Sequence, residues 1–384
     1  MDLIYLDHAA TSWPKPPAVL HAVLMAMEVG GGNPGRSGHQ LAMGAARRLV
    51  AAREALARLL GAPDPSCISF TKNATEALNT ALLGLLRPGD HVVTTAVEHN
   101  SVMRPLRHLE RQGVRVTVVP CTSDGLVDPE LVRRGLTART RLVVATHASN
   151  VLGAVQPIAE LGEVAHRGGA LFLVDAAQTA GSVPIDVQAM SVDLLAFPGH
   201  KALLGPQGTG GLYVRPGVDL PPLLRGGTGS ASELEEQPDF APDRYESGTP
   251  NVPGIAGLGA AAEHLLSWGI DRVREKEQLL VARFMSGLAN IPDVVVYGPP
   301  EPTRRVGLVS LNLRGVLPSA LGQALEEGYG ILTRVGLHCA PAAHRTAGTY
   351  PDGSVRFSFS GTTALEHVNI ALRALEELSV HART

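Results

Sequence analysis

A cysteine lies among histidines, arginines and small residues in the stretch RVGLHCAPAAHR, which runs from Arg334 to Arg345. The chain has only 3 cysteines, and no CxxC pair brings two of them close in sequence. Cys339 could therefore be a metal ligand, half of a disulfide, a buried apolar residue or a nucleophile. A zinc site made of His338, Cys339 and His344 lacks a fourth ligand and the usual spacing. An odd number of distant cysteines does not indicate a disulfide framework.

A lysine follows an apolar segment in AFPGHKALLGPQGTGGLYV, where Lys201 lies in a glycine-rich loop. A lysine in a confined, partly dry site loses its proton readily and can form a Schiff base. Asp175 ends the apolar segment LFLVD, and a buried carboxylate needs a partner because burying an unpaired charge is costly. Pyridoxal phosphate enzymes pair an acid with the ring nitrogen and a lysine with the aldehyde. Taken singly, Lys201 also fits a surface lysine and Asp175 a helix N-cap.

A phosphate needs fixed donors, and the segment FTKNATEALNTALLGLL offers a place for them. It reads as a strand that passes through a short polar loop into a helix. Backbone N–H groups at the start of that helix, with the Thr75 hydroxyl, would bind an anion. The alternative is that Asn73 or Thr75 only caps the helix. The chain has no GxxxxGK[ST] and no strand-linked GxGxxG motif, so the sequence does not indicate a nucleoside triphosphate or a dinucleotide.

Short apolar segments alternate with amphipathic ones through the first two thirds of the chain. The predicted strands are 67–70, 91–95, 114–120, 141–147, 171–177 and 193–199. The predicted helices are 18–32, 45–62, 73–86, 98–113, 128–136 and 158–169, and Gly61 is expected to stop the second of them. This alternation is typical of a mostly parallel sheet covered by helices. Polar residues follow the predicted strands, at the edge where open α/β sheets bind ligands.

A different pattern begins at about Gly254 and indicates a smaller α+β domain. The segments that build it are a long helical stretch over 255–289, apolar runs over 294–298, 308–313 and 355–360, and a last helix over 365–378. A length of 384 residues fits two domains better than one. We predict a large domain over 18–254 and a small domain formed by 1–17 and 255–384.

The composition favours a soluble globular enzyme, with 45% hydrophobic and 18% charged residues. A net charge of −3 argues against nucleic acid or an acidic membrane surface as the main partner. The N-terminal sequence MDLIYLDHAATSWPKPP lacks the basic and long apolar regions of a signal peptide. No run approaches the roughly 18 apolar residues of a membrane span. The expected compartment is the cytoplasm.

Taken together and in this order, the segments resemble the class V aminotransferase-like family of pyridoxal phosphate proteins. Within it they are similar to the cysteine desulfurases of the short-loop group, which also includes selenocysteine lyases. The matching segments span nearly the whole chain: YLDHAAT, GNPGRSGH, FTKNATEALN, EHNS, THASNVLGAVQPI, VDAAQ, GHKALLGPQGTGGLYV, ESGTPN and RVGLHCA. The resemblance implies an α/β chain of fold type I, with a mostly parallel seven-stranded sheet, and a homodimer with shared active sites.

The resemblance also implies which residues bind pyridoxal 5'-phosphate. Lys201 would attach it covalently, Asp175 would pair with the ring nitrogen, and His99 would stack on the ring and move protons. The other implied contacts are Gln178 and Asn150 near the phenolic oxygen, Thr75 and His200 at the phosphate, Ala74 beside Thr75, and Thr249 at the phosphate of the neighbouring subunit. No metal is implied.

One position departs from the family pattern. Desulfurases commonly have a serine two residues before the histidine of the "HK" pair, where its hydroxyl helps to hold the phosphate. This chain has Pro198 there, which offers neither a hydroxyl nor a backbone N–H. Several other phosphate donors remain, so the site is still expected to bind the cofactor.

The substrate side is implied in the same way. Arg356 would grip the substrate carboxylate, because a guanidinium suits that bidentate contact. Arg334 would be a second arginine near the cysteine, and Asn150 would also contact the substrate. Arg36 and His39 of GNPGRSGH would line the site.

The resemblance makes Cys339 the nucleophile of a cysteine desulfurase. Its thiolate would attack the sulfur of the substrate cysteine, giving alanine and an enzyme persulfide that passes its sulfur to an acceptor. Arg334 and His338 would favour the thiolate, and the small residues of APAAH would let the loop move. His344 and Arg345 are expected to be solvated loop residues.

Other functions stay open because fold does not fix function. The alternatives are a selenocysteine lyase, another C–S lyase, an epimerase or an aminotransferase on the same fold. A non-catalytic scaffold that keeps the fold is a further alternative. The presence of Lys201, Asp175 and Cys339 argues against the scaffold.

Overall fold

The larger part of the molecule is built on a seven-stranded sheet with the strand order β2-β8-β7-β6-β5-β3-β4. The computed structural model describes residues 3–29, 31–35 and 38–381. The strands of this sheet are β2 (Ile68–Thr71), β3 (His91–Thr95), β4 (Arg115–Val119), β5 (Thr140–Thr146), β6 (Leu171–Asp175), β7 (Leu194–Pro198) and β8 (Gly210–Val214). Only the pairs made by β8 are antiparallel. The predicted mostly parallel sheet is confirmed.

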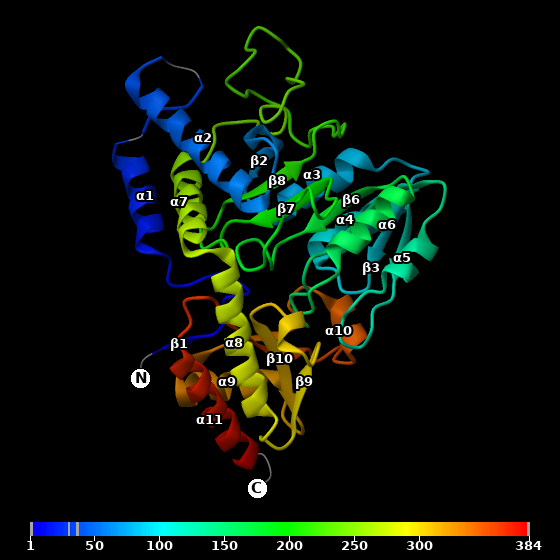
Figure 1. The fold of residues 1–384 in the computed structure, drawn as a ribbon, viewed down its shortest axis with the longest axis vertical. Helices are drawn as coiled ribbons and strands as arrows, with labels where there is room; N and C mark the ends of the chain where they lie inside the picture. Colours follow the sequence, from blue (N-terminus) through cyan, green and yellow to red (C-terminus); the bar gives the residue numbers. More distant parts are fainter. Residues whose placement is uncertain (1–2, 30, 36–37, 382–384) are drawn as a thin grey trace.

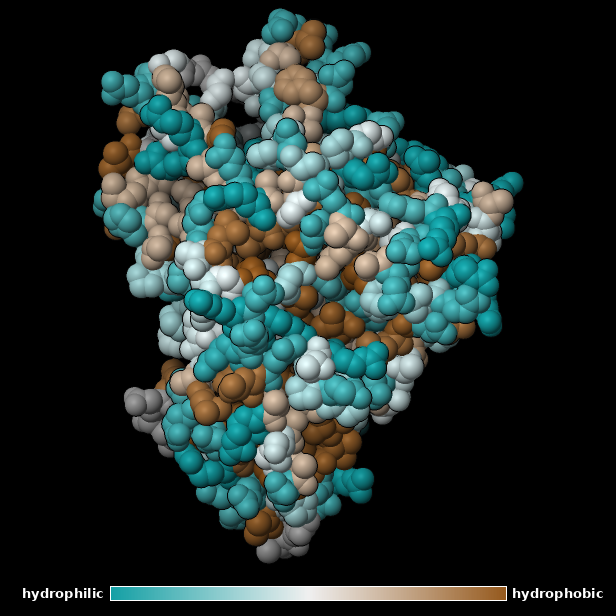
Figure 2. Space-filling view, viewed as in Figure 1, coloured by the Kyte–Doolittle hydropathy of each residue, from teal (hydrophilic) through white to brown (hydrophobic). Residues whose placement is uncertain are grey.

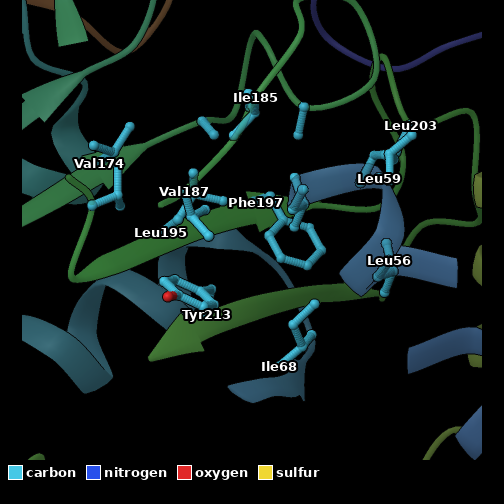
Figure 3. Packing of buried hydrophobic residues seen from close by; sticks show 14 of the residues in the cluster. Leu56, Leu59, Ile68, Val174, Ile185, Val187, Leu195, Phe197, Leu203 and Tyr213 are labelled. Carbon is cyan, nitrogen blue, oxygen red and sulfur yellow. The ribbon is translucent and has the colours of Figure 1, made fainter. Parts of the chain in front are cut away.

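Helices cover both faces of this sheet (Figure 1). They are α1 (Pro17–Glu28), α2 (Gln40–Leu60), α3 (Ala74–Leu85), α4 (Asn100–Arg111), α5 (Pro129–Gly135), α6 (Ile158–Arg167) and α7 (Val252–Trp268), with a short 3-10 turn, η1 (Pro65–Cys67), before β2. Neighbouring strand residues point to opposite faces: Val92 belongs to the core that contains α3 and α4, whereas Val93 belongs to the core that contains α2, α6 and α7. Figure 3 shows the second of these cores, with Phe197 of β7 and Leu56 of α2.

The ends of two helices follow from single residues. Helix α2 ends at Gly61, which takes the left-handed conformation with φ 66° and was the predicted stop. It begins at Gln40, five residues before the predicted start, because the His39 side chain caps it by accepting from the Ala42 N–H at 3.3 Å. Helix α3 is capped by Asn73, whose side chain accepts from the Glu76 N–H at 2.9 Å. Thr75 is therefore not needed as the cap.

The smaller part holds a four-stranded antiparallel sheet in the order β12-β13-β10-β9. Its strands are β9 (Val294–Tyr297), β10 (Leu308–Leu313), β12 (Arg334–Gly336) and β13 (Ser354–Ser358). The helices of this part are α8 (Ile270–Leu288), the 3-10 turn η2 (Pro302–Arg304), α9 (Pro318–Tyr329), α10 (Pro341–Ala347) and α11 (Leu365–His381). A separate parallel pair joins β1 (Ile4–Tyr5) to β11 (Ile331–Leu332).

The two parts have separate cores, and the consecutive helices α7 and α8 connect them. The predicted helix over 255–289 breaks at Gly269, which has φ 89°, and so forms α7 and α8. Leu258 of α7 packs in the core of the larger sheet, whereas Phe284 of α8 packs in the core of the smaller one. Leu6, near the N-terminus, also packs in the smaller core. The domain boundaries given above stay a prediction.

Among the residues that the structure describes, no helix is both long and apolar enough to cross a membrane.

Candidate functional site

A cavity lies at the carboxyl ends of β5, β6 and β7, next to the N-termini of α3 and α4. Its lining includes all the predicted cofactor-binding residues except Thr249. The lining residues are Asn73, Ala74, Thr75, His99, Ser101, Thr146, Ala148, Asn150, Asp175, Ala177, Gln178, Pro198, His200 and Lys201. Parallel strands and the loops that follow them bring these distant segments to one edge of the sheet.

The lysine and the aspartate of this cavity have strongly perturbed acidities. Burial lowers the pKa of Lys201 to about 8, although the nearby Asp175 carboxylate acts in the opposite direction. Asp175 is 2% exposed, and burial raises its pKa despite the Lys201 charge. Its Oδ1 accepts one hydrogen bond, from the Ala177 N–H at 2.9 Å. The site therefore holds an amine that is easily deprotonated and a buried carboxyl group that a cation would stabilise.

Two helix N-termini meet at one end of the cavity. The Thr75 hydroxyl of α3 lies 2.9 Å from the Ser101 hydroxyl of α4. The Ser101 hydroxyl also lies 2.8 Å from Nδ1 of His99. The Ser101 N–H donates to the same nitrogen at 3.0 Å. Because partial positive charge accumulates at helix N-termini, this end of the cavity suits an anion. Ser101 was not among the residues predicted for the site, although a hydroxyl residue near the start of each of two predicted helices, Thr75 and Ser101, indicates it.

Both histidines of the cavity are neutral at pH 7. Burial, with the Lys201 charge as the next cause, lowers the pKa of His99 and of His200 to about 4. Since Nδ1 of His99 accepts from the Ser101 N–H, its proton belongs on Nε2. Nδ1 of His200 is buried and has no hydrogen-bond partner among the described residues. The backbone of His200 is fixed, because its carbonyl oxygen accepts from Lys15 Nζ at 3.0 Å.

The two arginines predicted for the substrate lie directly opposite each other on adjacent strands, with Arg356 on β13 and Arg334 on β12. Arg356 is 2% exposed and donates to the Asn150 carbonyl at 2.9 Å and to Asp7 Oδ1 at 3.0 Å. Its Nε is buried without a partner in the described structure. Like charges opposite each other are unfavourable without a counter-charge. The Asp7 carboxylate balances only the charge of Arg356, so the two arginines together can accept a further anion.

Asn150 connects the cavity to the cysteine segment. Its side-chain amide donates to the His338 carbonyl at 2.6 Å, and its own carbonyl accepts from Arg356. On the other side of the cysteine, the Cys339 carbonyl accepts from the Asn100 N–H at 2.8 Å, next to His99. Cys339 itself is exposed. The nucleophile candidate is thus tied to both walls of the site through backbone contacts.

The backbone around the cysteine is strained. His338 and Cys339 have φ values of 49° and 58°, which place two consecutive non-glycine residues in the left-handed region. Each such residue costs about 1–2 kcal/mol, and such conformations cluster at functional sites when the surroundings hold them. The hydrogen bonds to the two carbonyls provide that hold. No sequence signal predicts this strain, because neither residue is a glycine or an asparagine.

Three expectations for the cysteine segment are wrong. His338 is 5% exposed, and burial lowers its pKa to about 2, so it carries no charge that could favour a thiolate. His344 is fully buried rather than solvated, and its Nδ1 lies 2.7 Å from the Thr349 hydroxyl. The rings of the two histidines are in contact, with centroids 5.5 Å apart. The segment after Cys339 forms α10 instead of a flexible loop, because Ala343 and His344 pack inward.

Two predicted residues, Thr249 and His39, lie elsewhere. Thr249 is exposed and lines a different cleft, beside α2 and β2. His39 is exposed at the N-terminus of α2, where it acts as the helix cap. Arg36 falls outside the described residues. Among those that are described, no group of three or more His, Cys, Asp or Glu residues is placed to hold a metal ion.

Known proteins resemble this chain over almost its full length. It is 38% identical to the probable cysteine desulfurase of Methanothermobacter thermautotrophicus, over 98% of this chain and 95% of that protein. It is 36% identical to a cysteine desulfurase of Escherichia coli, over 88% of this chain and 85% of that protein.

Solved structures agree with these relatives. The apo structure of a cysteine desulfurase from Thermococcus onnurineus NA1 has a TM-score of 0.92 and 34% identity, covering 99% of this chain and 95% of that one. The cysteine desulfurase CsdA of Escherichia coli has a TM-score of 0.88 and 31% identity, with the same coverage. The predicted fold is confirmed. The family model of the class-V aminotransferases matches residues 4–370, and the chain belongs to this family.

Proposed function

We propose that this chain is a pyridoxal phosphate-dependent cysteine desulfurase. It converts L-cysteine to L-alanine and receives the sulfur on Cys339 as a persulfide. The observation that carries the proposal is the exposed Cys339, fixed in a strained backbone between the wall of the lysine-containing cavity and Arg356. The names of the relatives, most of which are cysteine desulfurases or probable ones, support the same reaction.

The residues of the cavity fit pyridoxal phosphate. Lys201 has the lowered pKa of a lysine that attaches an aldehyde, and Asp175 is a buried carboxyl group that a ring N–H would satisfy. The N-termini of α3 and α4 suit the phosphate, and the unpartnered Nδ1 of His200 can donate to it. When bound, the cofactor would supply an electron sink that makes the Cβ–S bond of the substrate labile.

The chain's own residues then have distinct tasks. Arg356, with Arg334 beside it, binds the substrate carboxylate and so fixes the orientation of the amino acid. Lys201 as the free amine takes the proton from the substrate Cα and can return it. His99 is neutral, with an Nε2–H that can move a proton at the cavity wall. The Cys339 thiolate attacks the substrate sulfur, forming an S–S bond as the Cβ–S bond breaks.

Changing Arg356 to lysine is expected to raise the KM for L-cysteine by about 10-fold to 100-fold. A lysine keeps the charge but loses the forked contact, and a hydrogen bond to a charged group contributes about 1.5–3 kcal/mol. Arg345→Lys is the matched control, because Arg345 is exposed on α10. Steady-state alanine formation measures both variants. An unchanged KM in Arg356→Lys would remove this residue from the substrate site.

The reaction itself is tested by product analysis. The purified protein, loaded with pyridoxal phosphate, is incubated with L-cysteine and a reductant, and alanine and sulfide are quantified. Equal amounts of the two support desulfuration, whereas pyruvate indicates β-elimination and a D-amino acid indicates epimerisation. A specificity constant far higher for selenocysteine than for cysteine would assign a selenocysteine lyase. A protein that takes up no cofactor and forms no product would contradict the proposal.

We further propose that the enzyme is a homodimer with shared active sites. Thr249, expected at the phosphate of a neighbouring subunit, is exposed and does not line its own chain's cavity. Leu20, Leu24 and Met27 recur along one face of α1 and are 60%, 52% and 65% exposed. Figure 2 shows hydrophobic residues along the upper left edge, where Figure 1 places α1 and α2. An apolar face of this kind suits a second copy of the chain.

The dimer predicts a solution mass of twice the 40.3 kDa chain. Met27→Glu places a charge on the apolar face of α1 and is expected to shift the protein toward monomers. Leu317→Glu changes a residue of the smaller part that is 63% exposed and should leave the mass unchanged. Sedimentation equilibrium measures all three proteins, and a monomeric parent would contradict the dimer.

The need for a reduced cysteine supports a cytoplasmic location for the protein. Cys67, Cys121 and Cys339 are all free, and persulfide formation needs a reduced Cys339. A cytoplasmic location supplies reducing conditions. The sulfur would leave Cys339 by transfer to a thiol acceptor, for which the exposed position is suited. Cell fractionation that recovered the protein from an oxidising compartment would contradict this location.

A further inference from the structure

Ser101 lies between two of the groups that line the cofactor cavity. It is the second residue of α4, and its hydroxyl is 2.9 Å from the Thr75 hydroxyl and 2.8 Å from Nδ1 of His99. It lines the same cavity as both of these residues. The function proposed above gives His99 a task at the cavity wall but gives the Ser101 hydroxyl none.

The cavity has few groups that could hold a negatively charged phosphate. Among the described residues that line it, Lys201 is the only lysine or arginine. In the proposed function its amine attaches the aldehyde, so it does not serve the phosphate. Pro198, at the end of β7, also lines the cavity, but a proline offers neither a hydroxyl nor an N–H. Neutral donors from the other elements must therefore bind the phosphate.

Helix α3 offers backbone donors at its start. The Asn73 side chain accepts from the Glu76 N–H at 2.9 Å, and the Asn73 carbonyl accepts from the Ala77 N–H at 3.3 Å. The N–H groups of Ala74 and Thr75 have no acceptor among the described residues. Such N–H groups at a helix start need a partner from outside the helix. An anion in the cavity can accept from them and from the Thr75 hydroxyl.

Helix α4 differs from α3 because its first backbone donors are already taken. The N–H groups of residues 100–103 all have acceptors: the Cys339 carbonyl at 2.8 Å, Nδ1 of His99 at 3.0 Å, and the His99 carbonyl at 2.9 and 3.1 Å. None of these four N–H groups can turn to an anion without losing its present partner. The donor that α4 can offer at this end of the cavity is therefore the Ser101 hydroxyl.

The Ser101 hydroxyl can leave His99 at little cost. Burial lowers the pKa of His99 to about 4, so the ring is neutral and its Nδ1 has a single lone pair. The Ser101 N–H already donates to that lone pair at 3.0 Å. The hydroxyl proton is thus free to turn toward an anion. A hydrogen bond to an ionised acceptor is roughly twice as strong as one between neutral groups, so an anion wins this competition.

We propose that the Ser101 hydroxyl donates a hydrogen bond to the phosphate of pyridoxal phosphate, beside the Thr75 hydroxyl and the free N–H groups of α3. This inference rests on the proposed function, because it takes the cavity as the site of that cofactor. Ser101 then has two separate tasks. Its hydroxyl binds the phosphate, while its N–H keeps the His99 ring in place.

The test compares pyridoxal phosphate with pyridoxal, which has the same ring and aldehyde but no phosphate. Equilibrium dialysis of the apo-protein gives a dissociation constant for each compound. Ser101→Ala is expected to raise the constant for pyridoxal phosphate by about 10-fold to 100-fold, the range for the loss of a hydrogen bond to a charged group. The constant for pyridoxal should not change, because Lys201 and Asp175 remain in place.

Two further variants complete the test. Ser101→Asp places a negative charge beside the phosphate and is expected to weaken the binding of pyridoxal phosphate more than Ser101→Ala does. An acidic residue in the first turn of a helix is stabilising, so this variant keeps the test open if Ser101→Ala folds poorly. Ser319→Ala is the matched control, because Ser319 is the exposed second residue of α9. It should bind both compounds as the parent does.

The possible outcomes separate this inference from the proposed function. If the parent takes up neither compound and forms no visible band, the proposed function fails and the role of Ser101 fails with it. If the parent binds pyridoxal phosphate and the Ser101 variants bind it equally well, the role of Ser101 is wrong while the function stands. Equal weakening of both compounds would show that Ser101 only supports the shape of the cavity, and this result would also overturn the inference.

Discussion

Replacing Cys339 with alanine is expected to abolish the formation of sulfide and alanine from L-cysteine while the visible band of the bound cofactor remains. The cofactor cavity does not include the cysteine side chain, so its loss leaves Lys201 and Asp175 in place. The reaction, however, loses the thiolate that accepts the sulfur. Removing a covalent nucleophile typically lowers kcat by about three orders of magnitude or more.

The control for this result is a cysteine that has no access to substrate. Cys121 is partly buried, and burial raises its pKa to about 11, so at pH 8 it is almost entirely a thiol. Cys121→Ala should therefore turn over cysteine like the parent. Alanine and sulfide are quantified for both variants, and the persulfide on the parent is identified by mass spectrometry. Normal turnover by Cys339→Ala would show that the sulfur leaves without a covalent enzyme intermediate.

The sequence predicted only part of the difference between the reactive Cys339 and the unreactive Cys121. The resemblance singled out Cys339 through the segment RVGLHCA, and His338, the residue before it, was expected to favour the thiolate. That assignment failed because the acidity of a histidine depends on its burial. Here the His338 ring is buried and packs against His344 of α10, several residues later in the chain. A helix in the place of an expected loop removed both the charge and the flexibility that had been predicted.

The sheet was more predictable than the loops, with one exception. Strands such as His91–Thr95 appear in the sequence as short apolar runs between helices, which is the pattern that buried parallel strands require. Strand β8 begins with Gly210 and Gly211 and looks like a turn. A Cβ on Gly211 would collide with the ring of Phe197 on the neighbouring strand, so the missing side chain is what allows this close pairing. That reason exists only in the folded sheet.

The cofactor cavity itself could be anticipated because its residues follow strand ends. What the sequence did not predict is how they are linked. Asn150 was expected near the cofactor, yet its amide bonds to the His338 carbonyl and its own carbonyl bonds to Arg356. These backbone contacts join segments that are about two hundred residues apart in sequence, and backbone groups carry no sequence signal.

Replacing Lys201 with alanine is expected to have the largest effect on the cofactor itself. The variant cannot attach pyridoxal phosphate covalently, so the visible band of the parent is lost and alanine formation falls by about a thousandfold or more. Noncovalent binding should persist more weakly, because Asp175, His99 and the helix N-termini of α3 and α4 are unchanged. Absorption spectra and equilibrium dialysis with pyridoxal phosphate measure the two effects separately.

Lys15 provides a demanding control for this assignment. Burial lowers its pKa to about 8, the same value as that of Lys201, so low basicity alone does not distinguish the two lysines. Their positions do distinguish them. The Lys15 ammonium donates to the Ser12 hydroxyl at 2.7 Å and to the His200 carbonyl, and Lys15 does not line the cavity. Lys15→Met should keep the visible band. After borohydride reduction of the parent, the cofactor mass should appear on the peptide with Lys201, and its appearance on Lys15 would overturn the assignment.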